Sequence, residues 1–299
     1  EVTHHIQVVN NIARSGGQVF PCAAGMIIFH GSDNELLHND ISDFKYTGVS
    51  VGWVWGYTPS PSKRNRVEYN HIHHLGWGVL SDMGGVYTLG ASQGTTVSNN
   101  IIHHVYSLDY GGWGLYTDEG SEGITMENNL VYNCKSAGFH QHYGKENIIR
   151  NNIFINSIKS QLQATRVEKH RSFSFTNNIV YFSSGTLLSS NWATVDITTD
   201  ENCYWDTRDK NILFGKKTFA AWQQEGKDKH SVIADPGFKD VKNFDFRITN
   251  KRIISKIKFK PFDYSKAGVY GTAEWIQKAQ FDAVRAEAFD QMVAEHEKE

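Results

Sequence analysis

Short runs of alternating apolar and polar residues recur along most of the chain. Residues 96–98, 124–127, 147–150 and 173–176 show this alternation, and polar turns separate the runs. A period of two is typical of β-strands that bury one face, whereas helical repeats would need a period of 3.6 inside each unit. The pattern therefore predicts many short strands. One helix-like stretch, residues 218–224, interrupts it.

A motif of two polar residues, usually Asn-Asn, followed by an apolar residue marks each unit. Its copies are Asn10-Asn11-Ile12, Asn39-Asp40-Ile41, Asn70-His71-Ile72, Asn99-Asn100-Ile101, Asn128-Asn129-Leu130, Asn151-Asn152-Ile153, Asn177-Asn178-Ile179 and the degenerate Glu201-Asn202-Cys203. Their second positions are 29, 31, 29, 29, 23, 26 and 24 residues apart, which fits one solenoid coil per copy. Asn tolerates the left-handed backbone of a tight turn, so we expect these residues to stack in a ladder.

These features predict an all-β fold, a right-handed parallel β-helix over residues 1–272. A β-sandwich with chance Asn turns is the alternative, and the near-constant spacing disfavours it. Residues 273–299 are rich in helix formers, with Trp275, Ile276 and Phe289 at roughly helical spacing, so we expect a C-terminal helical tail or cap. Because the chain opens with Glu1 before a strand-like stretch, we expect it to be the C-terminal part of a longer β-helix protein.

Composition and charge narrow the classes of partner. The 299 residues carry 30 Lys and Arg against 32 Asp and Glu, a net charge of -2, so no global field attracts nucleic acid or an anionic membrane. No apolar run approaches the length of a membrane span. Three Cys far apart make neither a disulfide framework nor a CxxC metal site. We expect a monomer without nucleic-acid or membrane partners.

A second, sharper repeat contains the candidate catalytic residues. Residues 77–84 resemble residues 113–120, and each copy contains an Asp before its Gly, Asp82 and Asp118. If both copies form strands on adjacent coils, the two carboxylates share one outward face. Like charges so close raise the pKa of one group, which makes an acid and a base at the same pH, and paired carboxyl groups are the machinery of glycoside hydrolysis. The alternative is that both are turn residues that bond to their own backbone.

Other acidic residues compete for the acid role. Glu119 follows Asp118 directly, and Glu168 lies on a later coil. Aromatic rings stack on sugar rings, and His, Arg and Gln bind hydroxyl groups. The candidate substrate-binding residues are Trp53, Trp55, Tyr87, Trp113, Tyr116, His140, His142, Gln163, Arg166 and His170.

The fourteen histidines raise the question of a metal site. His71 and His73 alternate on one predicted strand, as do His140 and His142, and a neighbouring coil would have to add a ligand. No HExxH or compact Cys/His cluster is present. We therefore expect no metal site and no cofactor, with Ca²⁺ reserved for the lyase alternative given below.

Several blocks resemble a known family. Residues 48–53, 81–88, 112–120 and 138–144 resemble bacterial right-handed β-helix glycoside hydrolases, most closely glycoside hydrolase family 141, and the resemblance runs from about residue 4 to about 275. It implies a fold similar to that of pectate lyases, activity on plant or algal polysaccharide as an α-L-fucosidase or xylanase, and two catalytic Asp at Asp82 and Asp118. It also implies a secreted or periplasmic bacterial protein. Family members are longer and carry further coils on the N-terminal side.

Two other functions stay open. A polysaccharide lyase would abstract the proton next to a uronate with a basic residue, for which the candidates are His140, His142, Arg166 and Lys169, while Ca²⁺ neutralises the carboxylate. A β-helix that binds glycans without catalysis is the third possibility. Hydrolysis by Asp82 and Asp118 is our leading hypothesis.

Overall fold

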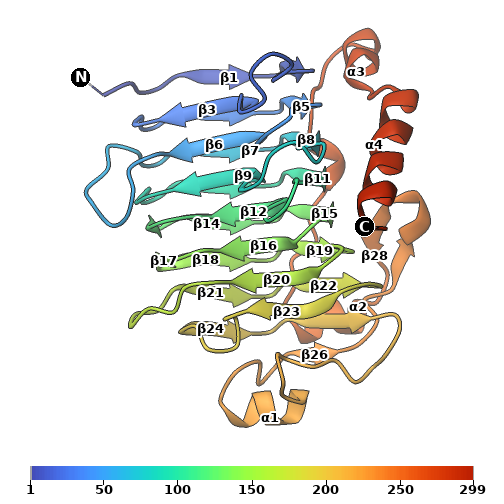
Figure 1. Cartoon of the computed structure of the whole chain (residues 1–299). Helices are drawn as coiled ribbons and strands as arrows, with labels where there is room; N and C mark the ends of the chain where they lie inside the picture. Colours follow the sequence, from blue (N-terminus) through green and yellow to red (C-terminus); the bar gives the residue numbers. More distant parts are fainter. Residues whose placement is uncertain (1, 299) are drawn as a thin grey trace.

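The computed structural model describes residues 2–298 and confirms the predicted solenoid of parallel strands. The first seven coils each contribute one strand to each of three parallel sheets, the eighth contributes to two sheets and the last to one, and the coils stack from the N-terminal to the C-terminal end (Figure 1). Every pairing between successive coils is parallel. Each sheet is named below by the number of strands that it contains.

The eight-stranded sheet comprises β1 (Gln7–Val9), β4 (Glu35–Leu37), β7 (Arg66–Glu68), β10 (Thr96–Ser98), β14 (Thr125–Glu127), β18 (Asn147–Arg150), β21 (Phe173–Thr176) and β24 (Ile197–Asp200). The nine-stranded sheet comprises β2 (Ile12–Arg14), β5 (Asp40–Ser42), β8 (His71–Leu75), β11 (Ile101–Val105), β15 (Leu130–Cys134), β19 (Ile153–Ile155), β22 (Ile179–Phe182), β25 (Cys203–Asp206) and β26 (Val232–Ile233). The seven-stranded sheet comprises β3 (Met26–Phe29), β6 (Val49–Gly52), β9 (Gly84–Leu89), β12 (Trp113–Thr117), β16 (Ala137–Gln141), β20 (Ser160–Ala164) and β23 (Thr186–Ser190). A short parallel pair, β13 (Ser121–Glu122) and β17 (Gly144–Lys145), lies outside these sheets.

Alternation along the strands creates the core. On the seven-stranded sheet, Val86, Leu115 and Phe139 occupy one register and are fully buried inside the solenoid. The next residue of each strand points outward, because successive side chains of a strand point to opposite faces. The inner positions therefore fix the fold, and the outer positions are free to carry chemistry.

The predicted Asn ladder is present at the turn between the eight-stranded and nine-stranded sheets. Each side-chain amide donates to the carboxamide oxygen of the next Asn at 3.0–3.3 Å. The members are Asn11, Asn39, Asn70, Asn100, Asn129, Asn152, Asn178 and Asn202. In the second and third copies the ladder residue is the first of the polar pair, so His38 and Tyr69 take the left-handed conformation there.

The C-terminal end of the solenoid is closed by α1 (Phe219–Gln224), which the sequence predicted as a helix-like stretch. Thr218 caps this helix, and Trp222 is fully buried, with its indole N–H donating to Asp228 at 2.7 Å. A hairpin of β27 (Phe238–Asp240) and β28 (Asp245–Ile248) follows, joined by a 3₁₀ turn at Val241–Asn243, and then α2 (Lys251–Lys256).

Residues 234–272, which the sequence analysis places in the solenoid, form a return segment instead of further coils. It includes a 3₁₀ turn at Tyr264–Lys266 and runs back along the Asn turns. Asn177 donates to the carbonyl of Ile257 at 2.8 Å, and Tyr270 donates its N–H to Asn10 at 2.9 Å. The first Asn of a polar pair can thus hold the return segment while the second builds the ladder.

The predicted C-terminal helices are present as α3 (Ala273–Ala279) and α4 (Ala283–His296). They lie along the flank of the nine-stranded sheet, not over an end of the solenoid (Figure 1). Phe289 is buried against this flank, and Arg285 forms a bidentate pair with Asp43 at 2.9 and 3.0 Å. No helix among residues 2–298 has the length and apolar character of a membrane span.

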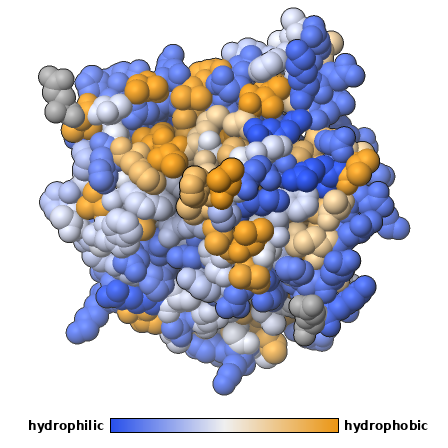
Figure 2. Space-filling view, turned by 45° about the horizontal axis from the view of Figure 1, so that its top comes forward, coloured by the Kyte–Doolittle hydropathy of each residue, from blue (hydrophilic) through white to orange (hydrophobic). Residues whose placement is uncertain are grey.

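Apolar side chains are exposed at the N-terminal end of the solenoid. Figure 2 turns this end forward and shows apolar patches among the polar surface. Ile6, Ile27 and Phe29 of the first coil expose 42–50% of their surface, and Phe20 exposes 75%. The two ends of the solenoid therefore differ, because α1 covers only the C-terminal one.

Candidate active site

The outer face of the seven-stranded sheet carries rings at one register. Tyr87 of β9, Tyr116 of β12 and His140 of β16 are paired residues on successive coils. The ring centroids of Tyr87 and Tyr116 lie 4.3 Å apart, and those of Tyr116 and His140 lie 5.1 Å apart. Each side chain is nearly fully buried by its neighbours. Stacking along the solenoid axis therefore makes a rigid wall, since none of these rings can turn without displacing the next.

Two tryptophans extend this wall on either side. Trp53, directly after β6, packs on Tyr87 with centroids 5.0 Å apart, and Trp113 of β12 stacks on His140 at 4.1 Å. The indole N–H of Trp113 donates to the Gln163 side-chain oxygen at 2.6 Å. We call these residues the aromatic row; its members are Trp53, Tyr87, Trp113, Tyr116 and His140. The row unites five predicted substrate-binding residues and Gln163 in one surface.

The two candidate Asp lie at opposite ends of strands in this face. Asp82 precedes β9 and accepts a hydrogen bond from the Tyr116 hydroxyl at 2.9 Å, whereas Asp118 follows β12 and accepts one from the Tyr87 hydroxyl at 2.5 Å. Because the two tyrosine rings pack against each other with their planes tilted by 40°, the carboxylates are linked through this tyrosine pair. Asp118 exposes 6% of its surface and Asp82 is partly exposed.

The expectation that both copies of the repeat form strands, with Asp82 and Asp118 close together on adjacent coils, is wrong. Gly84 pairs with Trp113, so Asp118 lies beyond the paired Thr88 and Thr117, at the opposite end of the strands from Asp82. Residues 77–83 form a turn, with positive φ at Trp77 and Asp82, and only the second copy of the repeat is a strand. Similar residues in the two copies therefore adopt different backbone conformations, since coil register is set by the paired strands and not by the local motif.

The environment separates the acid-base properties of these groups. Burial raises the pKa of Asp82; the negative charge of Asp118 adds to this, and the Tyr116 hydroxyl and His142 oppose it. Burial raises the pKa of both Tyr87 and Tyr116 far above the ordinary range, and the nearby carboxylates raise it further. Both phenols therefore stay protonated and act as donors to the carboxylates.

Two residues of the site escaped the sequence analysis. The Tyr46 hydroxyl donates to the backbone carbonyl of Asp82 at 2.8 Å, and burial together with Asp82 and Asp118 raises the pKa of Tyr46 to about 12. Tyr110 donates no side-chain bond to the site but exposes 57% of its surface, and its carbonyl accepts the Asp82 N–H at 2.9 Å. Neither belongs to a repeated motif, so only the coil register could have indicated them.

The remaining predicted residues form a second group beside the row. Tyr143 donates to Glu119 at 3.2 Å, and the Arg166 guanidinium lies 4.2 Å from the Tyr143 ring centroid. Glu168 accepts a bond from Tyr57, and His170 lies 3.2 Å from Glu168. Glu119 and Glu168, the two competing acids, thus accept their hydrogen bonds in this group and not from the pair Tyr87 and Tyr116.

Three further candidates differ in their surroundings. Trp55 is 57% exposed next to Trp53, with centroids 6.5 Å apart. The ring nitrogen Nδ1 of His142 lies 2.7 Å from the Thr165 hydroxyl. Burial lowers the pKa of His140 to about 3, so His140 is a neutral member of the row. The arrangement as a whole offers one carboxyl group with a raised pKa, a second carboxylate held by a phenol, and exposed aromatic rings beside them.

The comparison with protein families agrees with the fold. Residues 62–203 match the family "Right handed beta helix region", which confirms the predicted handedness. A solved structure described as a glycoside hydrolase is 32% identical over 51% of this chain, with a TM-score of 0.47, and the chain spans 26% of its length. The DFA-IIIase from Arthrobacter chlorophenolicus A6 is 13% identical, with a TM-score of 0.33, over 62% of this chain and 51% of that one. No curated protein matches the sequence significantly.

Proposed function

We propose that the protein hydrolyses glycosidic bonds, with Asp82 as the general acid and Asp118 as the base or nucleophile. The observation that carries the proposal is the pair of carboxylates bound to two phenols that pack against each other, Tyr87 and Tyr116. Glycoside hydrolysis needs one carboxyl group that keeps its proton and one that is ionised. Burial raises the pKa of Asp82, which favours Asp82 over Asp118 for the first role.

The roles follow from the surroundings of each group. Asp82 gives its proton to the glycosidic oxygen as the bond from that oxygen to the anomeric carbon breaks. Asp118, whose negative charge is stabilised by the Tyr87 hydroxyl, attacks the anomeric carbon or takes a proton from the water that does. Glu119 is the alternative for this second role, because it is partly exposed and next in the chain.

Exposed rings and charges beside the carboxylates define the binding surface. Trp55 and Tyr110 each expose 57% of their surface, and such rings can stack on the apolar face of a sugar. Arg166, stacked on Tyr143, provides hydrogen-bond donors near Glu119, at the Asp118 end of the strands. We propose a plant or algal polysaccharide as the substrate, with α-L-fucosyl or xylan linkages as the first candidates.

Product analysis tests this function. Pectin, rhamnogalacturonan and xylan fragments are incubated with the protein, and reducing ends and ultraviolet absorbance are followed together. We expect new reducing ends without absorbance, and a loss of about 10²–10⁴-fold in turnover for both Asp82→Asn and Asp118→Asn. Asp109→Asn is the matched control, since Asp109 is exposed in a neighbouring loop and bonds to Ser107 and Ser81 through its backbone atoms.

Other outcomes would redirect the assignment. Full activity in Asp118→Asn with loss in Glu119→Gln would transfer the second role to Glu119. Ultraviolet absorbance from an unsaturated product would contradict hydrolysis and indicate a lyase. Glycan binding without any product would indicate a binding module.

A further inference from the structure

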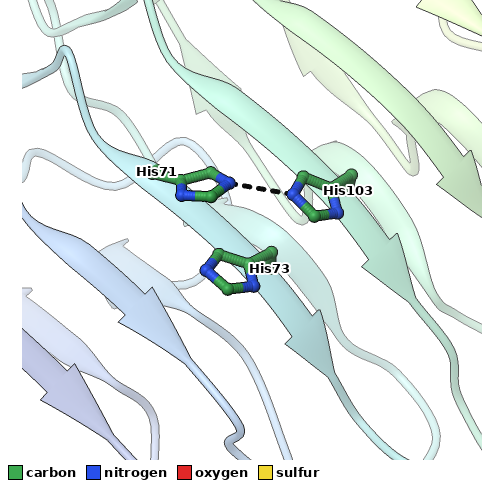
Figure 3. Close-up of side chains that lie close together, drawn as sticks. All are labelled: His71, His73 and His103. Carbon is green, nitrogen blue, oxygen red and sulfur yellow. Dashed lines mark hydrogen bonds between the residues drawn. The ribbon is translucent and has the colours of Figure 1, made fainter. Parts of the chain in front are cut away.

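A cluster of histidines lies on the outer face of the nine-stranded sheet, away from the aromatic row. His71 and His73 of β8 and His103 of β11 each offer a ring nitrogen within 4.8 Å of the others (Figure 3). Among residues 2–298, this is the one group of three or more potential metal ligands that meets at such distances. Parallel pairing sets His73 beside His103. Adjacent coils thus supply the third ligand that His71 and His73 lack on their own strand.

A buried carboxylate orients the histidines. Asp40 of β5, on the preceding coil, exposes 1% of its surface, and its Oδ2 lies 3.1 Å from His71 Nδ1 and 3.3 Å from His73 Nε2. A carboxylate only accepts, so both of these nitrogens carry the hydrogen. With Nδ1 bonded to Asp40, His71 places Nε2 on the other side of the ring, 2.9 Å from His103 Nε2. This nitrogen of His71 therefore faces a second imidazole.

We propose that His71, His73 and His103 bind one Zn²⁺ or similar divalent transition-metal ion, with Asp40 as the carboxylate that orients the ligands. Imidazole nitrogen is a preferred ligand of these metals, and a carboxylate bonded to the far side of a ligating imidazole is their usual outer partner. Two nitrogens on a tetrahedral Zn²⁺ lie about 3.3 Å apart. The 2.9 Å separation of His71 and His103 is therefore within a few tenths of an ångström of that spacing.

The surroundings favour a structural ion. Phe281 packs edge-on against His73 with centroids 5.2 Å apart, and Arg14 holds Asp40 Oδ1 at 3.3 Å. The His71 side chain is 30% exposed and provides the entry for the ion. The ion would connect β5, β8 and β11 beneath the C-terminal helices. The sequence analysis expected no metal site, because the contribution of His103 depends on the register between coils.

Metal titration of the untagged chain, after treatment with chelator, tests the proposal. We expect calorimetry to show one Zn²⁺ per chain at neutral pH, and a melting temperature about 5 °C higher at a hundredfold excess over the Kd. Co²⁺ should give the visible absorption of a tetrahedral nitrogen site. Mg²⁺ and Ca²⁺, which prefer oxygen ligands, should not bind there.

Two variants and a control make the test specific. His71→Asn and His103→Gln should each weaken Zn²⁺ binding at least tenfold and remove the Co²⁺ absorption. His71 is partly exposed, so its variant remains informative if His103→Gln does not fold. His230→Asn is the matched control, since His230 is an exposed histidine paired with Asp200 outside the cluster. Absence of binding by the unaltered chain, or equal binding by His71→Asn and the unaltered chain, would overturn the proposal.

Discussion

Two faces of the solenoid carry stacked rings, and they differ in what surrounds them. The aromatic row stacks across the seven-stranded sheet, and the histidines stack in the same way across the nine-stranded sheet, where the His73 and His103 rings are almost parallel with centroids 4.9 Å apart. The row ends in two carboxylates and exposed aromatic rings. The histidine face is covered by the C-terminal helices, with Phe281 and Phe289 packed on it.

Both faces are built from the same structural feature, a column of outward side chains along the solenoid axis. Parallel coils repeat the backbone at one register, so any outward position becomes a column of stacked side chains. The aromatic row has two carboxyl groups at its edges, one of them with a raised pKa, and exposed aromatic rings beside them, which suits the binding of a substrate. A column covered by a helix is shielded from large ligands, and it can serve stability or hold an ion. The two columns therefore differ in the groups that surround them: carboxyl groups and exposed rings on one face, and covering helices on the other.

We expect the largest difference between the two faces at low pH, where the buried histidines should lower the free energy of unfolding. Burial, together with the neighbouring histidines, lowers the pKa of His73 to about 3 and of His74 to about 2, and burial lowers that of His104 to about 4. These groups take up protons on unfolding, so their stability contribution is complete above pH 6.5 and is lost as the pH falls toward the folded values. The free energy of unfolding should decrease by about 1.4 kcal/mol per pH unit for each such histidine between pH 6 and 4.5.

Urea unfolding with chelator present measures this slope. Asp40 does not cancel it, because hydrogen bonds from His71 and His73 outweigh burial and hold the pKa of Asp40 far below this range. His104→Gln should reduce the slope by one proton. A slope unchanged by His104→Gln would contradict the neutral, buried state of this histidine.

The cover over the histidine face should dominate stability at neutral pH. Phe289 of α4 is 1% exposed and packs against Trp77 and His74 at centroid distances of 5.0 and 5.2 Å. Phe289→Ala should lower the free energy of unfolding by about 3–5 kcal/mol, through lost burial and a cavity. Val284→Ala on the same helix, at a residue 75% exposed, should change it by less than about 0.5 kcal/mol. Equal effects of the two substitutions would mean that α4 does not cover the face.

The sequence predicts the solenoid well and its outer columns poorly. The Asn copies reveal the coil period, because one Asn per turn is required at a fixed position, and the ladder from Asn11 to Asn202 confirms it. The ladder Asn directly precedes its strand in every coil, so at Asn39 and Asn70 it is the first residue of the polar pair, and Asp40 and His71 begin the strands.

The sequence analysis selected the residues of the candidate site, but it did not predict their geometry. Asp82 and Asp118 were selected from a repeat whose two copies differ in structure, and their link through Tyr87 and Tyr116 depends on pairing across coils. His103 was missed for the same reason. Loop lengths between strands vary, so the residue that lies opposite another on the next coil can be known only from the structure.

Substrate contacts should belong to the open face alone. Trp55 is 57% exposed, and removal of one stacking ring should cost about 1 kcal/mol of binding, a roughly fivefold rise in KM with kcat retained. Trp55→Ala should leave the melting temperature unchanged. Tyr270→Ala, at a 52% exposed aromatic of the return segment, is the control and should leave KM unchanged. A kcat loss without a KM change in Trp55→Ala would contradict a binding role.

The smallest change is the loss of one hydroxyl group from the tyrosine pair. The Tyr116 hydroxyl donates to Asp82 and stabilises its ionised form, so it holds the pKa of Asp82 below the value that burial and Asp118 would otherwise impose. Tyr116→Phe should raise this pKa. If Asp82 is the general acid, activity disappears where Asp82 loses its proton, and the alkaline limb of the kcat/KM profile should move to higher pH. Tyr87→Phe removes the hydroxyl that bonds to Asp118 instead, and should leave the alkaline limb in place. An alkaline limb that moves with Tyr87→Phe and not with Tyr116→Phe would exchange the roles of the two carboxyl groups.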